Sequence, residues 1–171
     1  DWTSVVQPTH FDIDESTASV AFIATSSLHP IRSVGSLSGW VNATINDGAF
    51  AEDQELKGHL EVPIIGLSSG NRLIDREMKR RLDAQLHPGI RASLEETLHI
   101  EGNRATIAGT IDFFGTSTLV EGEIAILPGP RLVGNGEFDV RWWGLEPPRL
   151  LMVRVEPIVT VEIDAPLVER P

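Results

Sequence analysis

The chain contains no cysteine, and that absence removes several kinds of chemistry at once. Disulfide bonds, a thiolate nucleophile and a cysteine-type zinc site are all excluded, and the redox compartment is left open. Stability therefore has to come from a core of ordinary side chains. A chain of 171 residues is long enough to bury such a core without staples, so we expect a single domain over residues 1–171.

Basic residues and long apolar runs are also scarce. The 14 Lys and Arg residues face 25 Asp and Glu, which gives a formal net charge of −11 and disfavours binding to nucleic acid, whose phosphates would be repelled. No run approaches the roughly 18 to 20 apolar residues that span a bilayer, so stable membrane insertion is not expected. Residues 1–10 lack the basic start and apolar centre of a signal peptide. Because the first residue is Asp1 and not a methionine, localisation stays open between the cytoplasm and a periplasmic or secreted location after processing.

Signatures of catalysis and of metal binding are missing as well. No two histidines are spaced i, i+2 on a strand or i, i+4 on a helix, so no metal site is predicted; they stand at positions 10, 29, 59, 87 and 99. The segment Gly66–Gly70 has the Gly-x-Ser-x-Gly spacing of a hydrolase nucleophile elbow, but a hydrolase would also need an acid and a base beside that serine, and we do not predict one. Neither a phosphate-cradling loop nor a dinucleotide fingerprint occurs, and we predict no cofactor.

What the chain does have is alternation of apolar and polar residues, which is typical of half-buried strands. About eight long strands are expected, and one hairpin is indicated by Asp47-Gly48, a pair that suits tight turns. The pattern predicts an all-β protein, an extended eight-stranded antiparallel barrel with one helix, in preference to two packed sheets. The expected strands cover residues 10–14, 18–24, 37–45, 56–64, 90–100, 105–113, 120–126, 132–143 and 150–164.

Helical periodicity is confined to Ser68–Pro88. Apolar residues recur there at every fourth position, which predicts one buried helix face, formed by Ile74, Met78, Leu82 and Leu86. Asn71 or Ser69 is the expected cap. Five basic residues lie within ten positions: Arg72, Arg76, Lys79, Arg80 and Arg81. Arg72 and Arg76 are the candidates for binding an anionic head group, and the alternative is an ordinary solvated helix face.

The predicted inner face of the barrel is nearly uncharged, with Glu96 as the exception, and rich in small residues: Ala24, Gly39, Ala43, Gly58, Ala92, Gly109 and Gly122. Small lining residues indicate an elongated apolar cavity. The same glycines would also let a coiled sheet bend around a packed core. The residues expected to line a cavity are Phe22, Val41, Leu60, Leu94, Ile111, Phe113, Ile124, Phe138 and Trp142, although packing alone would explain them.

Several segments together resemble the YceI-like family of polyisoprenoid-binding proteins. They are Phe11–Asp14, Gly35–Gly39, the stretch from Gly66 through Asp75 with Leu86–Pro88, Ile107–Gly115 and Val140–Leu145. The chain departs from the family pattern at Gly115–Thr118, where a Lys/Thr-Pro segment is usual, and His29 does not clearly match the family's histidine. The resemblance implies a lipocalin-like antiparallel barrel that holds a long isoprenoid or other amphiphilic lipid, often as a homodimer.

Three functions are compatible with these observations. The first, which we favour, is non-catalytic binding, carriage or sequestration of a long apolar ligand. The second is an isomerase or cyclase that uses the same cavity, with Glu96 or Asp112 as the acid–base group. The third is a packed interaction module with Trp40 and Trp143 exposed. Arg141 is expected to pair with Asp75 or to stack on Trp143.

Overall fold

The computed structural model describes residues 7–147, 149–150 and 153–171. Its main sheet contains eleven strands. They are β1 (Thr9–Ile13), β2 (Ser19–Ser26), β3 (Ile31–Gly35), β4 (Ser38–Ala43), β7 (Lys57–Pro63), β8 (Gly89–Glu101), β9 (Arg104–Phe113), β10 (Thr116–Leu127), β11 (Arg131–Asp139), β12 (Arg149–Leu150) and β13 (Val153–Arg170). A separate hairpin is formed by β5 (Ile45–Asn46) and β6 (Ala49–Phe50). The helical elements are α1 (Arg72–Arg81) and two 3₁₀ turns, η1 (Ile64–Gly66) and η2 (Val140–Trp143).

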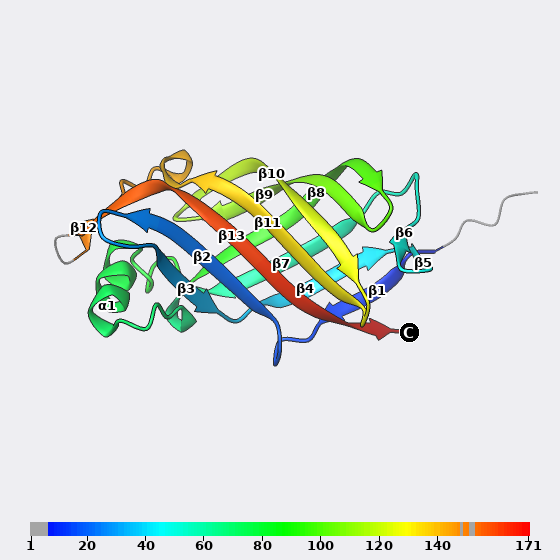
Figure 1. The fold of residues 1–171 in the computed structure, drawn as a ribbon, viewed down its shortest axis with the longest axis horizontal. Helices are drawn as coiled ribbons and strands as arrows, with labels where there is room; N and C mark the ends of the chain where they lie inside the picture. Colours follow the sequence, from blue (N-terminus) through cyan, green and yellow to red (C-terminus); the bar gives the residue numbers. More distant parts are fainter. Residues whose placement is uncertain (1–6, 148, 151–152) are drawn as a thin grey trace, which may run out of the picture.

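Eight strands close into an antiparallel barrel, which confirms the predicted all-β, lipocalin-like fold class. Neighbouring strands follow the order β1, β4, β7, β8, β9, β10, β11 and β13, and β13 pairs with β1 to complete the ring. The long strand β13 pairs with β1 near its end and with β2 along its earlier part. Beyond β2, the edge strand β3 is joined to the segment before α1 through the bridge between Val34 and Ser68. The helix therefore sits against the end of the barrel where β2 and β3 turn (Figure 1).

The predicted Asp-Gly hairpin is confirmed, although it belongs to the small sheet of β5 and β6. Asp47 and Gly48 both have positive φ, at 51° and 76°. Two consecutive residues with positive φ are what a type I′ turn requires, and this turn matches the natural twist of two strands. The strand expected over residues 37–45 consequently ends at Ala43, and the chain turns away from the barrel wall.

The helix is shorter than the sequence periodicity predicts. Its first turn is capped by Asn71, whose side-chain oxygen accepts hydrogen bonds from the amides of Leu73 (3.0 Å) and Ile74 (3.1 Å). Its last residue is Arg81, and Asp83 already adopts a positive φ of 48°. The expected burial of Leu86 is therefore wrong: the chain has left the helix before that residue, and Leu86 is exposed.

Two strand predictions near the carboxyl end also need correction. The strand expected over residues 132–143 stops at Asp139, whose carboxylate accepts from the amide of Arg141 (2.9 Å) and caps η2. The strand expected over 150–164 continues to Arg170, while residues 151–152 lie outside the described residues. Strand β3 was not predicted, because one of its inward residues is the polar Ser33.

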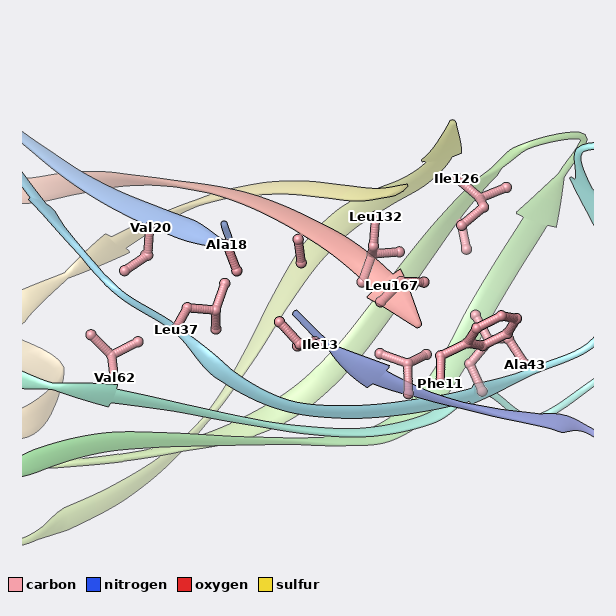
Figure 2. Close-up of a cluster of buried hydrophobic side chains, with 14 of the residues drawn as sticks. Phe11, Ile13, Ala18, Val20, Leu37, Ala43, Val62, Ile126, Leu132 and Leu167 are labelled. Carbon is pink, nitrogen blue, oxygen red and sulfur yellow. The ribbon is translucent and has the colours of Figure 1, made fainter. Parts of the chain in front are cut away.

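The hydrophobic core extends from the end of the barrel where β13 finishes to Leu67 and Leu82 beside the helix. Figure 2 shows Phe11, Ile13, Ile126 and Leu167 among the buried side chains at the end where β13 finishes. Leu56, which is completely buried, belongs to the same cluster, and its amide donates to the hydroxyl of Thr97 (2.9 Å). Apart from Leu67 and Leu82, none of these apolar side chains borders the internal space described below, so the end where β13 finishes is sealed by packing.

Candidate ligand cavity

Between the packed end and the helix, the barrel encloses a cavity of about 300 Å³. This volume lies at the lower end of the roughly 300 to 1,000 Å³ that is usual for small-molecule sites. Inward residues from β2, β3, β4, β7 to β11 and β13 form its wall, together with Met78, Arg81 and Leu82 at α1. The surface of the wall is almost entirely apolar. The hypothesis of a barrel packed solid is therefore wrong for this chain.

Glycines shape this space in two ways. Gly58, Gly109 and Gly122 all border the cavity, as expected. At Gly109 an added Cβ would lie only 2.4 Å from the carbonyl oxygen of Ser93, so this glycine is required by the close approach of β8 and β9. At Gly136 an added Cβ would meet the ring of Phe138 at 2.7 Å, since that ring lies over the glycine. Some of the small residues therefore leave space for the cavity, and others allow the close packing of strands and side chains.

The structure brings most of the predicted lining residues together. Eight of them border the cavity: Phe22, Val41, Leu60, Leu94, Ile111, Phe113, Ile124 and Phe138. The inward position predicted for Trp142 is wrong, because η2 interrupts the strand and reverses which side chains face inward. Trp142 is half exposed, and Trp143 borders the cavity instead. Arg72 and Arg76 lie on the exposed side of α1, away from the lining.

Trp143 forms an aromatic wall that sequence reasoning missed. Its indole nitrogen donates a hydrogen bond to the carbonyl oxygen of Ile111 (2.9 Å), which satisfies the polar atom of a buried ring. The rings of Phe113 and Phe138 meet it edge to face, with centroids 6.2 Å and 6.3 Å away. The exposure predicted for Trp143 is therefore wrong, while Trp40 is half-buried and stacked on His10.

Arg81 is the one Lys or Arg among the described residues that borders the cavity. Its Nε lies 3.3 Å from the carboxylate of Glu77, which Arg80 also contacts through two nitrogens. Hydrogen bonding from Arg80 is the main reason that the pKa of Glu77 is lowered. Since Arg80 already balances Glu77, Arg81 adds positive charge at the helix end of an apolar cavity.

Arg141 does not make the contact expected for it. Its guanidinium pairs with Asp139, 2.6 Å away, and this hydrogen bond is the main cause of the lowered pKa of Asp139. The carboxylate of Asp75 instead accepts from the amide (2.8 Å) and hydroxyl (2.6 Å) of Ser69. The ion pair of Arg141 therefore fixes η2, and with it the aromatic wall.

The inward position predicted for Glu96 is also wrong. The pairing of β8 with β9 steps from Leu94 opposite Gly109 to Glu96 opposite Ala108, so Glu95 is an extra residue in a β-bulge. The bulge reverses the alternation, and Glu96 is exposed outside the cavity lining, as is Asp112.

Within the described part of the chain, no three side chains form a metal-binding cluster, and no helix is long and apolar enough to cross a bilayer.

Fold and cavity together define a lipocalin-like barrel with a ligand-sized apolar interior. Comparison with solved structures narrows this fold to that of the YceI proteins. BcnA from Burkholderia cenocepacia is similar with a TM-score of 0.74 and 12% identity, over 92% of this chain and 99% of that one. A polyisoprenoid-binding domain from Saccharophagus degradans has a TM-score of 0.69 and 12% identity, over 96% and 100%.

The YceI protein of Campylobacter jejuni is similar as well, with a TM-score of 0.58 and 10% identity, over 100% of this chain and 90% of that one. No family model matches the chain, and no curated protein does. Identities this low show the fold. They confirm the YceI-like barrel that the resemblance of the sequence motifs implied.

Proposed function

We propose that this chain is a YceI-like protein that binds and carries, or sequesters, a long apolar ligand without chemical conversion. The observation that supports the proposal most strongly is the apolar cavity that runs between a packed barrel end and a helix with a basic residue at its edge. One protein of the same fold is described as a polyisoprenoid-binding domain. An isoprenoid or a similar lipid is the ligand class that this interior suits.

The chemistry of the wall favours recognition by length and shape. Nearly all lining atoms are carbon, so each methylene group of a ligand that leaves water contributes about 0.8 kcal/mol. Few hydrogen-bonding groups are present to demand a matching polar ligand. The two carboxylates named for the catalytic alternative, Glu96 and Asp112, are both exposed and outside the cavity lining, which supports binding without conversion.

Within this proposal, the apolar residues of the wall hold the chain of the ligand and Arg81 meets its head group. We propose Phe22, Val41, Leu60, Leu94, Ile111, Phe113, Ile124 and Phe138 as ligand contacts, and Trp143 in place of Trp142. Arg81 takes the role first predicted for Arg72 and Arg76, since it borders the space that a ligand would fill. A guanidinium favours a phosphate or diphosphate head group.

Native mass spectrometry of protein purified without detergent, followed by organic extraction, tests the carrier function. We expect a bound lipid of defined mass. A ligand-free protein that also takes up no farnesol when it is offered would refute the proposal.

A second experiment tests the head-group assignment. Arg81→Gln should weaken the binding of farnesyl diphosphate by roughly tenfold, because a hydrogen bond to a charged group is worth about 1.5 to 3 kcal/mol. Binding of farnesol, which has no charge, should not change. Arg76→Gln is the matched control on the outer side of the same helix, and an equal loss there would instead support the original assignment.

A further inference from the structure

Large apolar side chains are exposed around the helix end of the barrel. Among the described residues, six large apolar side chains have between 52% and 74% of their surface accessible. One, Leu119, lies on β10, and the other five are Leu28, Ile65, Leu73, Leu86 and Trp142. They lie on five different segments: the loop between β2 and β3, η1, α1, the segment after α1, and η2. Large apolar side chains exposed together on one part of a molecule are a feature of interaction surfaces.

Specific contacts tie two of these segments to neighbouring parts of the barrel. The amide of Ser27 donates to the carbonyl of Arg154 (2.9 Å), which ties the loop between β2 and β3 to the start of β13. The ring of His87, next to Leu86, packs on Phe114 with centroids 5.2 Å apart. Figure 1 shows α1, β12 and the turn between β2 and β3 at the end opposite the C-terminus. This is also the end at which Met78 and Arg81 border the cavity.

The helix at this end carries an unusual charge. Residues 71–83 contain five basic and three acidic side chains, a net charge of +2 in a chain of −11. Two of the three acids are engaged: Glu77 with Arg80 and Arg81, and Asp75 with Ser69. Asp83, Glu146 and Glu156 are exposed nearby. On α1, Leu73 shares a face with residues 76, 77 and 80, so one exposed leucine lies among arginines.

We propose that this helix end docks on an anionic lipid membrane. The exposed apolar side chains would enter the boundary between head groups and acyl chains, and the arginines of α1 would lie against lipid phosphates. Docked in this way, the helix end of the cavity faces the bilayer, and an apolar ligand would pass between them without crossing water. The docking extends the proposed carrier function, but the contact itself needs no bound ligand.

Charge favours a lipid surface over a second copy of the chain. Two copies joined through this end would bring two net positive helices together, and like charges repel. An anionic membrane attracts the same residues. The negative charge of the rest of the barrel does not prevent this, because salt screens charges beyond about 8 to 10 Å, so the nearest end dominates the interaction.

Vesicle binding tests the docking surface. The probes are vesicles of phosphatidylcholine with about one-third phosphatidylglycerol and vesicles of phosphatidylcholine alone, and we expect tighter, salt-sensitive binding to the first. One basic residue near an anionic surface strengthens binding by roughly fivefold, so the double variant Arg72→Gln, Arg76→Gln should bind roughly 25-fold more weakly. Lys57→Gln with Arg104→Gln is the matched control. It removes the same charge from exposed positions on β7 and β9 and should change binding less than about twofold.

Three results would overturn the proposal. One is equal binding to both vesicle types, or to neither. Another is an equal loss in the control variant, since only total charge would then matter. The third is a dimer in sedimentation equilibrium that Leu73→Ser with Leu86→Ser converts to a monomer, because a second copy would then cover this surface. Ala92→Trp, which fills the cavity, should still bind vesicles, so failure of docking and failure of ligand carriage can be told apart.

Discussion

Strand β8 offers a direct test of the cavity. Regular alternation would place Ala92 and Glu96 on the same face of this strand, but Ala92 faces the cavity and Glu96 faces outward. Ala92 pairs with Leu60 on one side and Ile111 on the other, and all three border the cavity. Glu96 is four residues further along, but the bulge at Glu95 turns it outward. We predict that Ala92→Trp abolishes ligand uptake and that Glu96→Trp does not.

The size of the effect follows from the space that the indole takes. If the indole displaces roughly four or five methylene groups of a bound chain, at about 0.8 kcal/mol each, the ligand loses roughly 3 to 4 kcal/mol. That corresponds to a loss of affinity of roughly two to three orders of magnitude. The cavity of about 300 Å³ leaves little room for the chain to bind elsewhere.

Thermal unfolding with farnesol measures the effect. A ligand at about 100 times its Kd stabilises the folded protein by about 2.7 kcal/mol. For a chain of this length each kcal/mol raises Tm by about 2 to 4 °C, so we expect a rise of roughly 5 to 11 °C for the wild type and for Glu96→Trp. No rise is expected for Ala92→Trp, whose unliganded Tm checks that it folds. An equal rise in both variants, or its loss in Glu96→Trp, would refute the assignment of the wall.

Three further predictions concern stability. Leu56→Ala, at the packed end and outside the cavity, should lower the free energy of unfolding in urea by roughly 2 to 5 kcal/mol without changing ligand affinity. Asn71→Ala should lose the cap of α1, at about 1 kcal/mol, and speed hydrogen exchange at the amides of Leu73 and Ile74. The pKa of Asp139 is lowered by Arg141, so its stabilising contribution is complete above the ordinary carboxyl pKa and is lost as the pH falls through the lowered value. Urea unfolding from pH 6 to pH 2 should therefore show a smaller loss of stability for Asp139→Asn than for the wild type; equal losses would contradict this.

Alternation was enough to predict the barrel, since a strand with one buried face repeats every second residue. It missed β3 because Ser33 interrupts the apolar side of that short strand. It also assigned Glu96 and Trp142 to the wrong side, for a shared reason. Alternation predicts orientation only while the strand is regular, and the bulge at Glu95 and the 3₁₀ turn after Asp139 each reverse it. No sequence signal marks that bulge, but an aspartate that caps a turn is a signal that could have ended the strand.

Helical geometry alone could have predicted which basic residues of α1 lie near the cavity and which face the solvent. Successive residues are rotated by about 100°, so Arg81 lies about 60° from Met78 around the helix axis, and Arg76 lies about 160° away. Once Met78 faces the cavity, Arg81 must lie near its rim and Arg76 must face the solvent. What the sequence could not give is the position of the helix over the end of the barrel, which depends on the packing of Ile74 with Ile31 and Val155. In the two proposals made above, one short helix would offer a cation to a head group inside the cavity and others to a surface outside, and the Arg81 and Arg76 variants separate these two roles.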